Sequence, residues 1–524
     1  MTPSSKLPTV RRLVSRAAPL ALCTALLATA ATAAPQSGKL AIKAGKILTK
    51  PGAPAIEDGV IVIVDGRISA VGGADTEIPW DAEVIDAPQW VAFPGFVEAH
   101  TSNGIDRPNE NIDIVPFLQI SDSVDPVAFF FEDALRWGMT TINVQQGNQT
   151  VIAGQGLIVK PTGMTVEEML VSTDAGLKLS ATPKRGNSSA TQVQTLRQAF
   201  GDLRRYLEDL VQQKKDGSDQ SRREALFQGR ELEGEAAKGR AMEGSAWKVE
   251  GLERVPRGEI DEKQAPLLTL VEGRMRAFFY CGRAMDVVHA LAIARENGFL
   301  AQTALLLDGD SWKAADRIAE AGVPAIWEGD VMFSERDVIT GELRETFVPG
   351  ELDRRGVRFA LSSENPSSQS LWYQAALCVG QGLPRAKALA AVTIVPAEIL
   401  GLGKRVGSLE VGKDGNVLLL SGDPLAVTSW VERVVIEGRP VYDRSTDIRI
   451  QHLLEGQTPP GTMAMGASLE RGPVCCEELL PHTHEAGEVK KTDGEQGEKK
   501  DEKKPEDKPE QKKPDEKQQG GEPK

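Results

Sequence analysis

His100 lies at the end of an apolar run, a position from which a histidine can bind a metal ion. An apolar run over residues 91–98 leads through Ala99 into His100, and a strand points its residues i and i+2 to the same side. A second histidine at position 102 would therefore give two imidazoles facing one metal ion. The residue there is Ser102, a poor ligand for a divalent transition metal. His100 is thus a candidate ligand that needs partners from elsewhere in the chain.

A second group of metal-binding residue types lies near the C-terminus. Cys475 and Cys476 are followed by His482 and His484, and thiolates with imidazoles are the usual ligands of zinc. Adjacent cysteines are awkward co-ligands, and the cluster borders a charged tail. A vicinal disulfide or free thiols are the alternatives to a zinc site.

The elements that must position His100 begin with a β-rich segment. Residues 38–93 alternate between apolar and polar, and Asp65-Gly66 is the dipeptide that a tight hairpin turn prefers. Residues 405–450 are also strand-like. Two β segments that bracket one long α/β segment predict a small β domain built from both flanks.

Residues 94–404 alternate between strand-like runs and amphipathic helices, which is typical of a parallel βα architecture. Eight strands suit an α/β fold of the (β/α)8 TIM-like barrel type, with its chemistry at the carboxyl ends of the strands. The expected strands are 91–98, 140–144, 156–160, 176–179, 276–280, 301–307, 323–327 and 358–361. A helical insertion is expected over about residues 181–265, either as a solvated decoration or as a partner-binding helix.

The two ends of the chain have compositions of their own. Residues 1–33 combine Arg11-Arg12 with an apolar run and a small-residue cleavage site, which predicts a signal peptide and a protein exported to the periplasm or the medium. Residues 451–484 are expected to form a linker. Residues 485–524 are a charged tail with too few apolar residues to offset the entropy of ordering, so disorder is expected there.

Charge and hydropathy exclude several classes of partner. The formal net charge of −14 argues against nucleic acid and anionic membranes. After the N-terminal segment no apolar run is long enough to span a bilayer, so no membrane insertion is expected after cleavage.

Three segments resemble the amidohydrolase superfamily, in particular its secreted imidazolonepropionase-like members. Residues 94–100 are similar to the first barrel strand of the family, residues 382–401 to its closing helix, and residues 406–420 to the return into its small β domain. The resemblance implies a barrel with a composite β-sandwich domain, often dimeric. The activity that it implies is metal-dependent hydrolysis of C–N bonds, in amides or cyclic amides, of small molecules.

The resemblance also implies a set of site positions at the strand ends. His100 and Ser102 fall on the paired histidines of strand one, Lys178 on the lysine of strand four with Lys160 as its rival, and Tyr280 on the histidine of strand five. Strand six ends at Asp308 without a histidine, and Glu364 takes the place of the aspartate of strand eight. The metal ligands expected from this set are His100, Lys178, Asp308 and Glu364.

Three functions remain open from these residues. One is a hydrolase in which His100, Asp308 and Glu364 hold one divalent ion, zinc or similar, with Glu364 as the general base. Another is a metal-free hydrolase in which Asp308 and Glu364 act as an acid/base pair. The third is a non-catalytic barrel, a pseudoenzyme that binds a small ligand or has a structural role.

Overall fold

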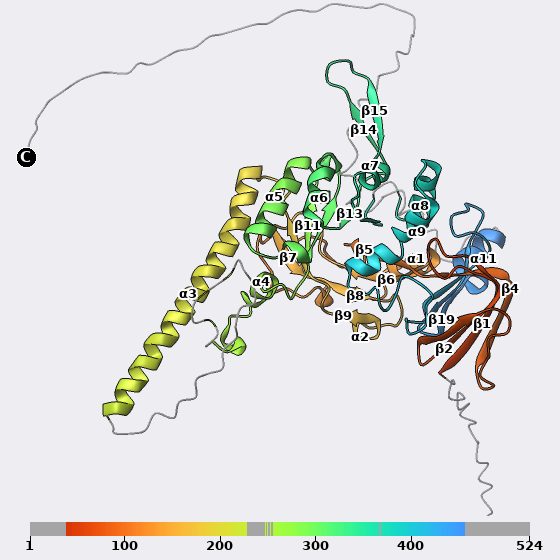
Figure 1. Cartoon of the computed structure of the whole chain (residues 1–524), viewed down its shortest axis with the longest axis horizontal. Helices are drawn as coiled ribbons and strands as arrows, with labels where there is room; N and C mark the ends of the chain where they lie inside the picture. Colours follow the sequence, from red (N-terminus) through yellow and green to blue (C-terminus); the bar gives the residue numbers. More distant parts are fainter. Residues whose placement is uncertain are drawn as a thin grey trace, which may run out of the picture. The chain divides into compact units, whose positions relative to one another are not determined.

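The structure is a computed structural model that describes residues 38–227, 247, 249, 252, 255–365 and 368–455 (Figure 1). The chain divides into two units, Met1–Gln451 and His452–Lys524, and the account below concerns the first. The expected signal peptide (1–33), the cysteine–histidine cluster and the charged tail (485–524) lie outside the described residues.

Both flanks of the chain contribute to one seven-stranded sheet. Its order is β19-β18-β17-β4-β1-β2-β3, and β4 joins the flanks because it pairs with β1 on one side and β17 on the other. The turn between β2 and β3 has Asp65 and Gly66 at positive φ, as the hairpin prediction requires. The strands are β1 (Lys39–Ile47), β2 (Ile56–Val64), β3 (Arg67–Gly72), β4 (Glu83–Pro94), β17 (Val417–Leu420), β18 (Val431–Ile436) and β19 (Arg439–Asp443).

The central part of the chain has the mixed α/β sheets of a TIM-barrel-type fold. One sheet has the order β16-β13-β12-β11-β10-β7, and a second has the order β5-β6-β8-β9. Most of these strands are buried along their whole length, as strands covered on both faces must be. They are β5 (Phe96–Thr101), β6 (Met139–Val144), β7 (Ile152–Gln155), β8 (Leu157–Val159), β9 (Leu170–Ser172), β10 (Leu177–Ser180), β11 (Ala277–Cys281), β12 (Thr303–Leu307), β13 (Ala325–Trp327) and β16 (Phe359–Leu361).

One expected strand runs in the opposite direction. The segment 156–160 was expected among eight parallel strands, but β8 is antiparallel to β6, and β7 before it is antiparallel to β10. The cause is the short connection over residues 145–151, which cannot hold a crossover helix. Strands β10, β11, β12, β13 and β16 pair in parallel, as do β5 and β6. Among the described strands, no ladder of backbone hydrogen bonds joins β16 to β5.

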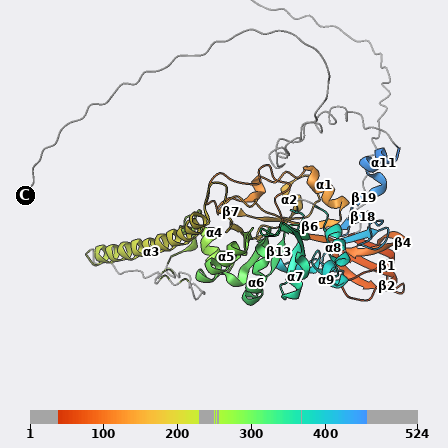
Figure 2. The same ribbon diagram turned by 90° about the horizontal axis from the view of Figure 1, so that it is seen from above.

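Helices cover the outer side of these strands, and α5, α6 and α7 lie side by side along β11 to β13 (Figures 1 and 2). No helix in the described part of the chain is both long and apolar enough to cross a membrane. The remaining helices are α1 (Phe129–Arg136), α2 (Val166–Met169), α4 (Ala265–Val271), α5 (Ala284–Glu296), α6 (Ala315–Ala321), α7 (Val348–Arg354), α8 (Leu371–Gly380), α9 (Arg385–Ala390), α10 (Ile394–Ile399) and α11 (Ile448–Glu455).

Helix α3 (Ser189–Phe227) falls in the range of the expected helical insertion. Its first half packs inward because Leu196, Phe200, Leu203 and Leu207 recur at helical spacing and are buried. The ring of Phe200 lies 5.5 Å from that of Phe299. Residues 212–217 are polar and exposed, so the apolar stripe that fixes the helix ends near Val211.

A two-stranded hairpin separates β13 from α7. Strands β14 (Met332–Arg336) and β15 (Leu343–Phe347) pair antiparallel and project from the helices (Figure 1). Val338 and Ile339 at its tip are almost fully exposed.

Candidate functional site

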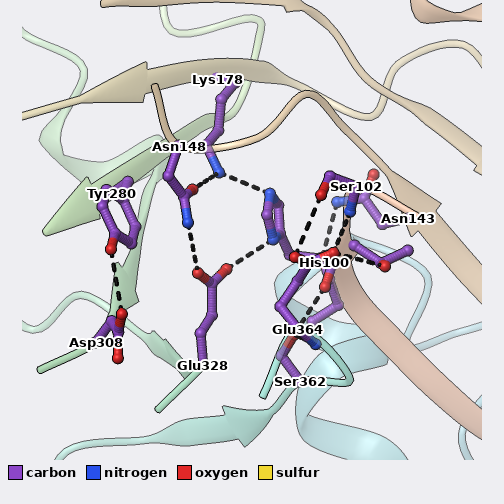
Figure 3. A network of polar contacts seen from close by, with 12 residues as sticks. His100, Ser102, Asn143, Asn148, Lys178, Tyr280, Asp308, Glu328, Ser362 and Glu364 are labelled. Carbon is purple, nitrogen blue, oxygen red and sulfur yellow. Dashed lines mark hydrogen bonds and ion pairs between the residues drawn. The ribbon is translucent and has the colours of Figure 1, made fainter. Parts of the chain in front are cut away.

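Four polar side chains form a closed ring at the carboxyl ends of the central strands (Figure 3). Lys178 Nζ lies 2.7 Å from His100 Nε2 and 2.7 Å from Asn148 Oδ1. Glu328 completes the ring: its Oε1 lies 2.6 Å from His100 Nδ1, and its Oε2 accepts a hydrogen bond from Asn148 Nδ2 at 3.1 Å. His100 comes from β5, Lys178 from β10, Glu328 from the end of β13, and Asn148 from the loop after β6.

The direction of the hydrogen bond between Lys178 and His100 depends on the tautomer of the imidazole. When Lys178 is charged it donates to His100 Nε2, and the ring proton then lies on Nδ1, which faces the carboxylate of Glu328. The contact with Glu328 is an ion-pair distance, although its angle is too bent for a well-formed hydrogen bond. His100 and Lys178 are fully buried, Glu328 is 3% exposed and Asn148 is half-buried. A buried lysine and a buried carboxylate are therefore connected through His100 and Asn148.

Burial and pairing perturb both charged groups of the ring. Burial lowers the pKa of Lys178 to about 8, and the neighbouring carboxylates of Glu328 and Glu364 only partly oppose that shift. Burial by itself raises the pKa of Glu328, but His100, Lys178 and Asn148 together hold this pKa below its ordinary value. Glu328 thus stays ionised beside a lysine that loses its proton more easily than usual.

Glu364 lies beside this ring and is held by the residues after His100. Its Oε1 accepts hydrogen bonds from Thr101 Oγ1 at 2.8 Å, from the backbone N–H of Ser102 and from Asn103 Nδ2 at 3.4 Å. Its Oε2 accepts one from Ser102 Oγ at 3.2 Å. Ser102, at the position where a second histidine would be a ligand, therefore serves to fix the carboxylate of Glu364, which stays half-exposed.

Side chains also connect β5 with the end of β16. Glu98 accepts hydrogen bonds from the backbone N–H of His100 at 3.1 Å and of Ser363 at 2.7 Å. Ser362 Oγ donates to the carbonyl of His100 at 2.8 Å. Glu98 is fully buried, and this burial raises its pKa to about 8.

Tyr280 and Asp308 form a separate pair on the other side of the ring (Figure 3). The hydroxyl of Tyr280 lies 3.3 Å from Asp308 Oδ2. Burial raises the pKa of Asp308, and the carboxylate of Glu328 adds to that shift. Burial also raises the pKa of Tyr280, so the phenol keeps its proton. Asp308 can therefore hold a proton at a higher pH than an ordinary aspartate.

The residues of this site do not fit a divalent metal ion. Within the described residues, no three histidine, cysteine, aspartate or glutamate side chains are grouped so that they could hold an ion. One ring nitrogen of His100 faces the side-chain nitrogen of Lys178, and the other faces the carboxylate of Glu328. The carboxylate oxygens of Glu364 accept hydrogen bonds from Thr101 and Ser102. The four expected ligands His100, Lys178, Asp308 and Glu364 thus lie near one another without surrounding one point.

Lys160, the expected rival of Lys178, lies elsewhere. Its Nζ contacts Asp414 Oδ2 at 2.7 Å and Glu437 Oε1 at 2.6 Å, and Arg405 also contacts Asp414 at 3.0 Å. This ion-pair cluster joins the strand segment of β8 to the C-terminal flank. Lys160 is therefore a connecting residue and no part of the ring.

Sequence reasoning missed Glu328, Asn148 and Glu98. Glu328 directly follows the expected strand 323–327, so the rule that selected the other strand ends would have found it. Glu98 is the last residue of the expected strand 91–98, so the same rule would have selected it, and it is completely buried. Asn148 lies in a loop, where no periodicity distinguishes it from its neighbours.

Comparisons with known proteins agree with this framework. A family model described as the amidohydrolase family matches residues 295–442. An amidohydrolase of Hapsidospora irregularis is 37% identical over 83 residues, which are 16% of this chain and 8% of that protein. The imidazolonepropionase of Syntrophobacter fumaroxidans is 31% identical over 151 residues, 27% of this chain and 35% of that protein. The chain thus matches well under half the length of either relative.

A solved structure extends the likeness of the fold over most of the chain. The amidohydrolase from Thermotoga maritima matches with a TM-score of 0.62 and 24% identity. The match covers 77% of this chain and the whole of that one. At this identity the likeness concerns the fold alone.

Proposed function

We propose that the chain is a member of the amidohydrolase superfamily and that it hydrolyses a carbon–nitrogen bond, of an amide or cyclic amide, in a small molecule; the match of residues 295–442 to the family model supports this. The observation that carries this proposal is the buried ring of His100, Lys178, Glu328 and Asn148 at the carboxyl ends of the strands. Active sites of barrel enzymes are built at that end. Buried charges with perturbed pKa values are also enriched at catalytic sites.

Two half-exposed carboxyl groups flank the ring and can supply the proton transfers. Glu364, oriented by Thr101 and Ser102, takes a proton from the attacking water. The water oxygen bonds to the carbonyl carbon. Asp308, whose raised pKa favours its protonated form, gives a proton to the nitrogen as the C–N bond breaks. An open-chain amide gives one carboxylic acid and one amine, and a cyclic amide gives one molecule that carries both groups. No step in this sequence uses a metal ion, because the residues do not fit one.

We infer that this site stands on a closed barrel with a composite β-sandwich beside it. Alternate residues from both central sheets are buried in one common cluster that includes Val97, Ile158, Phe278, Leu306 and Ile326. Such a shared inner layer is typical of a barrel interior. The hydrogen bonds from Ser362 and Ser363 to β5 support closure between β16 and β5.

Turnover of a substrate panel tests the proposal. Formation of the ring-opened amino acid is measured for cyclic amides, and release of the amino acid for N-acyl amino acids, with and without a chelator. Glu364→Gln keeps the size of the side chain but cannot take a proton, so turnover should fall by at least about a hundredfold. Glu345→Gln, on the exposed hairpin strand β15, is the matched control and should leave turnover unchanged. Equal turnover in Glu364→Gln and the wild type would contradict the role of Glu364.

The contact between Lys178 and His100 favours a second candidate function, a non-catalytic barrel that binds a small molecule. The Nε2 atom of His100 contacts the side-chain nitrogen of Lys178, so it is not free to bind a metal ion that would act as a Lewis acid. Thermal stabilisation by a panel ligand without turnover would support this function. Turnover that depends on Glu364 would exclude it.

The N-terminal segment supports export, and we infer that the mature chain starts at Ala34. Edman sequencing of the exported protein would test this, and retention of residues 1–33 would contradict it. Family resemblance supports a homodimer, which light scattering on the purified chain would test.

A further inference from the structure

A cation already occupies the position beside His100 from which a metal ion would act. A metal bound by His100 would have to approach its free ring nitrogen, since Nδ1 faces Glu328. That free nitrogen, Nε2, has the ammonium nitrogen of Lys178 2.7 Å away. A zinc–imidazole bond is about 2.0–2.1 Å long, so an ion on Nε2 and the ammonium group cannot both be present.

The polar contacts of Lys178 hold its side-chain nitrogen in one place as a hydrogen-bond donor. Nζ donates to the oxygen of Asn148, and the nitrogen of the same amide donates to Glu328, which fixes the orientation of the amide. Burial lowers the pKa of Lys178, and the carboxylates of Glu328 and Glu364 partly oppose that shift. A lysine that carried a carbamate would place a negative group next to the ionised Glu328, where like charges repel.

We propose that the ammonium group of Lys178 is the resident cation of this site and that it stands in place of a divalent metal ion. Its ligands are Asn148 Oδ1 and His100 Nε2, and Glu328 contacts the other polar atom of each of these two side chains. This assignment deepens the proposed function, on which it rests for the location of the site. Lys178 is a positioning residue here: it holds His100 and Asn148 and balances Glu328, and its nitrogen is too buried to reach a substrate.

Metal binding tests the proposal without any measurement of activity. The full chain is purified without chelator or histidine tag and titrated with Zn²⁺ and Co²⁺ by calorimetry, alongside His100→Ala and the control His289→Ala. His289 lies on α5 away from the ring. Ions bound elsewhere, for example by Cys475 and His482, are retained in His100→Ala. The wild type and His100→Ala should therefore bind the same number of ions. An ion that is lost in His100→Ala and kept in His289→Ala would overturn the proposal.

Two further measurements make the proposal specific to the ammonium group. Native mass spectrometry at neutral pH, where a carbamate is retained, should give the mass of the unmodified chain, and the added mass of one carbamate would overturn the assignment. In Lys178→Ala the ligands of the ammonium are left free, so Co²⁺ affinity that depends on His100 should rise at least about tenfold, or 1.4 kcal/mol. No gain in a folded Lys178→Ala would also overturn the assignment. If Lys178→Ala fails to fold, the wild-type titration and the mass measurement still decide the matter.

Discussion

A double-mutant cycle between Lys178 and Glu328 tests whether the ring is one charge-balanced unit. Lys178→Met and Glu328→Gln each keep the volume of the side chain but remove one charge. Because both groups are buried, each single change leaves an uncompensated charge, and removal of one partner of a buried pair typically costs about 3–5 kcal/mol of unfolding free energy. The double variant leaves no buried charge in the ring. Its loss should be smaller than the sum of the single losses by about 2–3 kcal/mol.

The lowered pKa of Lys178 gives a second estimate of how much free energy a buried charge in the ring costs. Its pKa of about 8 lies some 2.5 units below the ordinary value of 10.5, which corresponds to about 3 kcal/mol at pH 7. A lowered lysine pKa means that the unfolded chain binds more protons between pH 8 and 10.5. Stability from this group therefore rises with pH over that window, and Lys178→Met should flatten the rise.

Urea unfolding at pH 7 measures the coupling, and urea unfolding between pH 8 and 10.5 measures the rise of stability with pH. The buried Trp327 next to Glu328 reports on this end of the strands. Lys313→Met with Glu335→Gln is the matched control pair, because these exposed groups also form an ion pair. Its coupling should stay below about 1 kcal/mol. If the losses of Lys178→Met and Glu328→Gln add to within about 0.5 kcal/mol, the two charges are independent and the account of the ring is wrong.

Three other variants probe the surroundings of the ring. The pKa of Glu98 is raised to about 8, so its contribution to stability is complete below about pH 4.5 and is lost as the pH rises through 8. In urea titrations, Glu98→Gln should reduce the fall in stability between pH 5 and 8 by about 3 kcal/mol. An unchanged fall would contradict the raised pKa. Asn148→Asp places a carboxylate against Glu328 and should lower the urea midpoint at pH 7 more than at pH 5, where the new acid is partly protonated; equal losses at both pH values would argue against a repulsion. Lys160→Met leaves the buried Asp414 paired with Arg405 alone and should lower the unfolding free energy by about 2–4 kcal/mol. Ligand binding at the ring should not change, and a change in binding would place Lys160 in the site.

The sequence predicted the flanking β segments and most of the strands, because hydrophobic periodicity is a local property. The direction of a strand is not local: residues 156–160 have the same apolar pattern whether they run parallel or antiparallel, and only the short loop before them indicates the reversal. The same limit applies to the site. Lys160 and Lys178 both come late in an apolar run, and only the folded chain separates the lysine beside Asp414 from the lysine beside His100.

The side-chain contacts that join β5 to β16 involve a carboxylate that a ligand would also bind. Where neighbouring strands usually share a backbone ladder, these two are joined through Glu98, Glu364, Ser362 and Ser363. Any ligand that recruits the carboxylate of Glu364 must compete with Thr101 and Ser102 for its oxygens. Binding would therefore loosen this junction while it occupies the site. Stronger hydrogen bonds from Thr101 and Ser102 to Glu364 would make the junction of β5 with β16 more rigid. They would also lower the affinity of the site for a ligand that needs the same carboxylate.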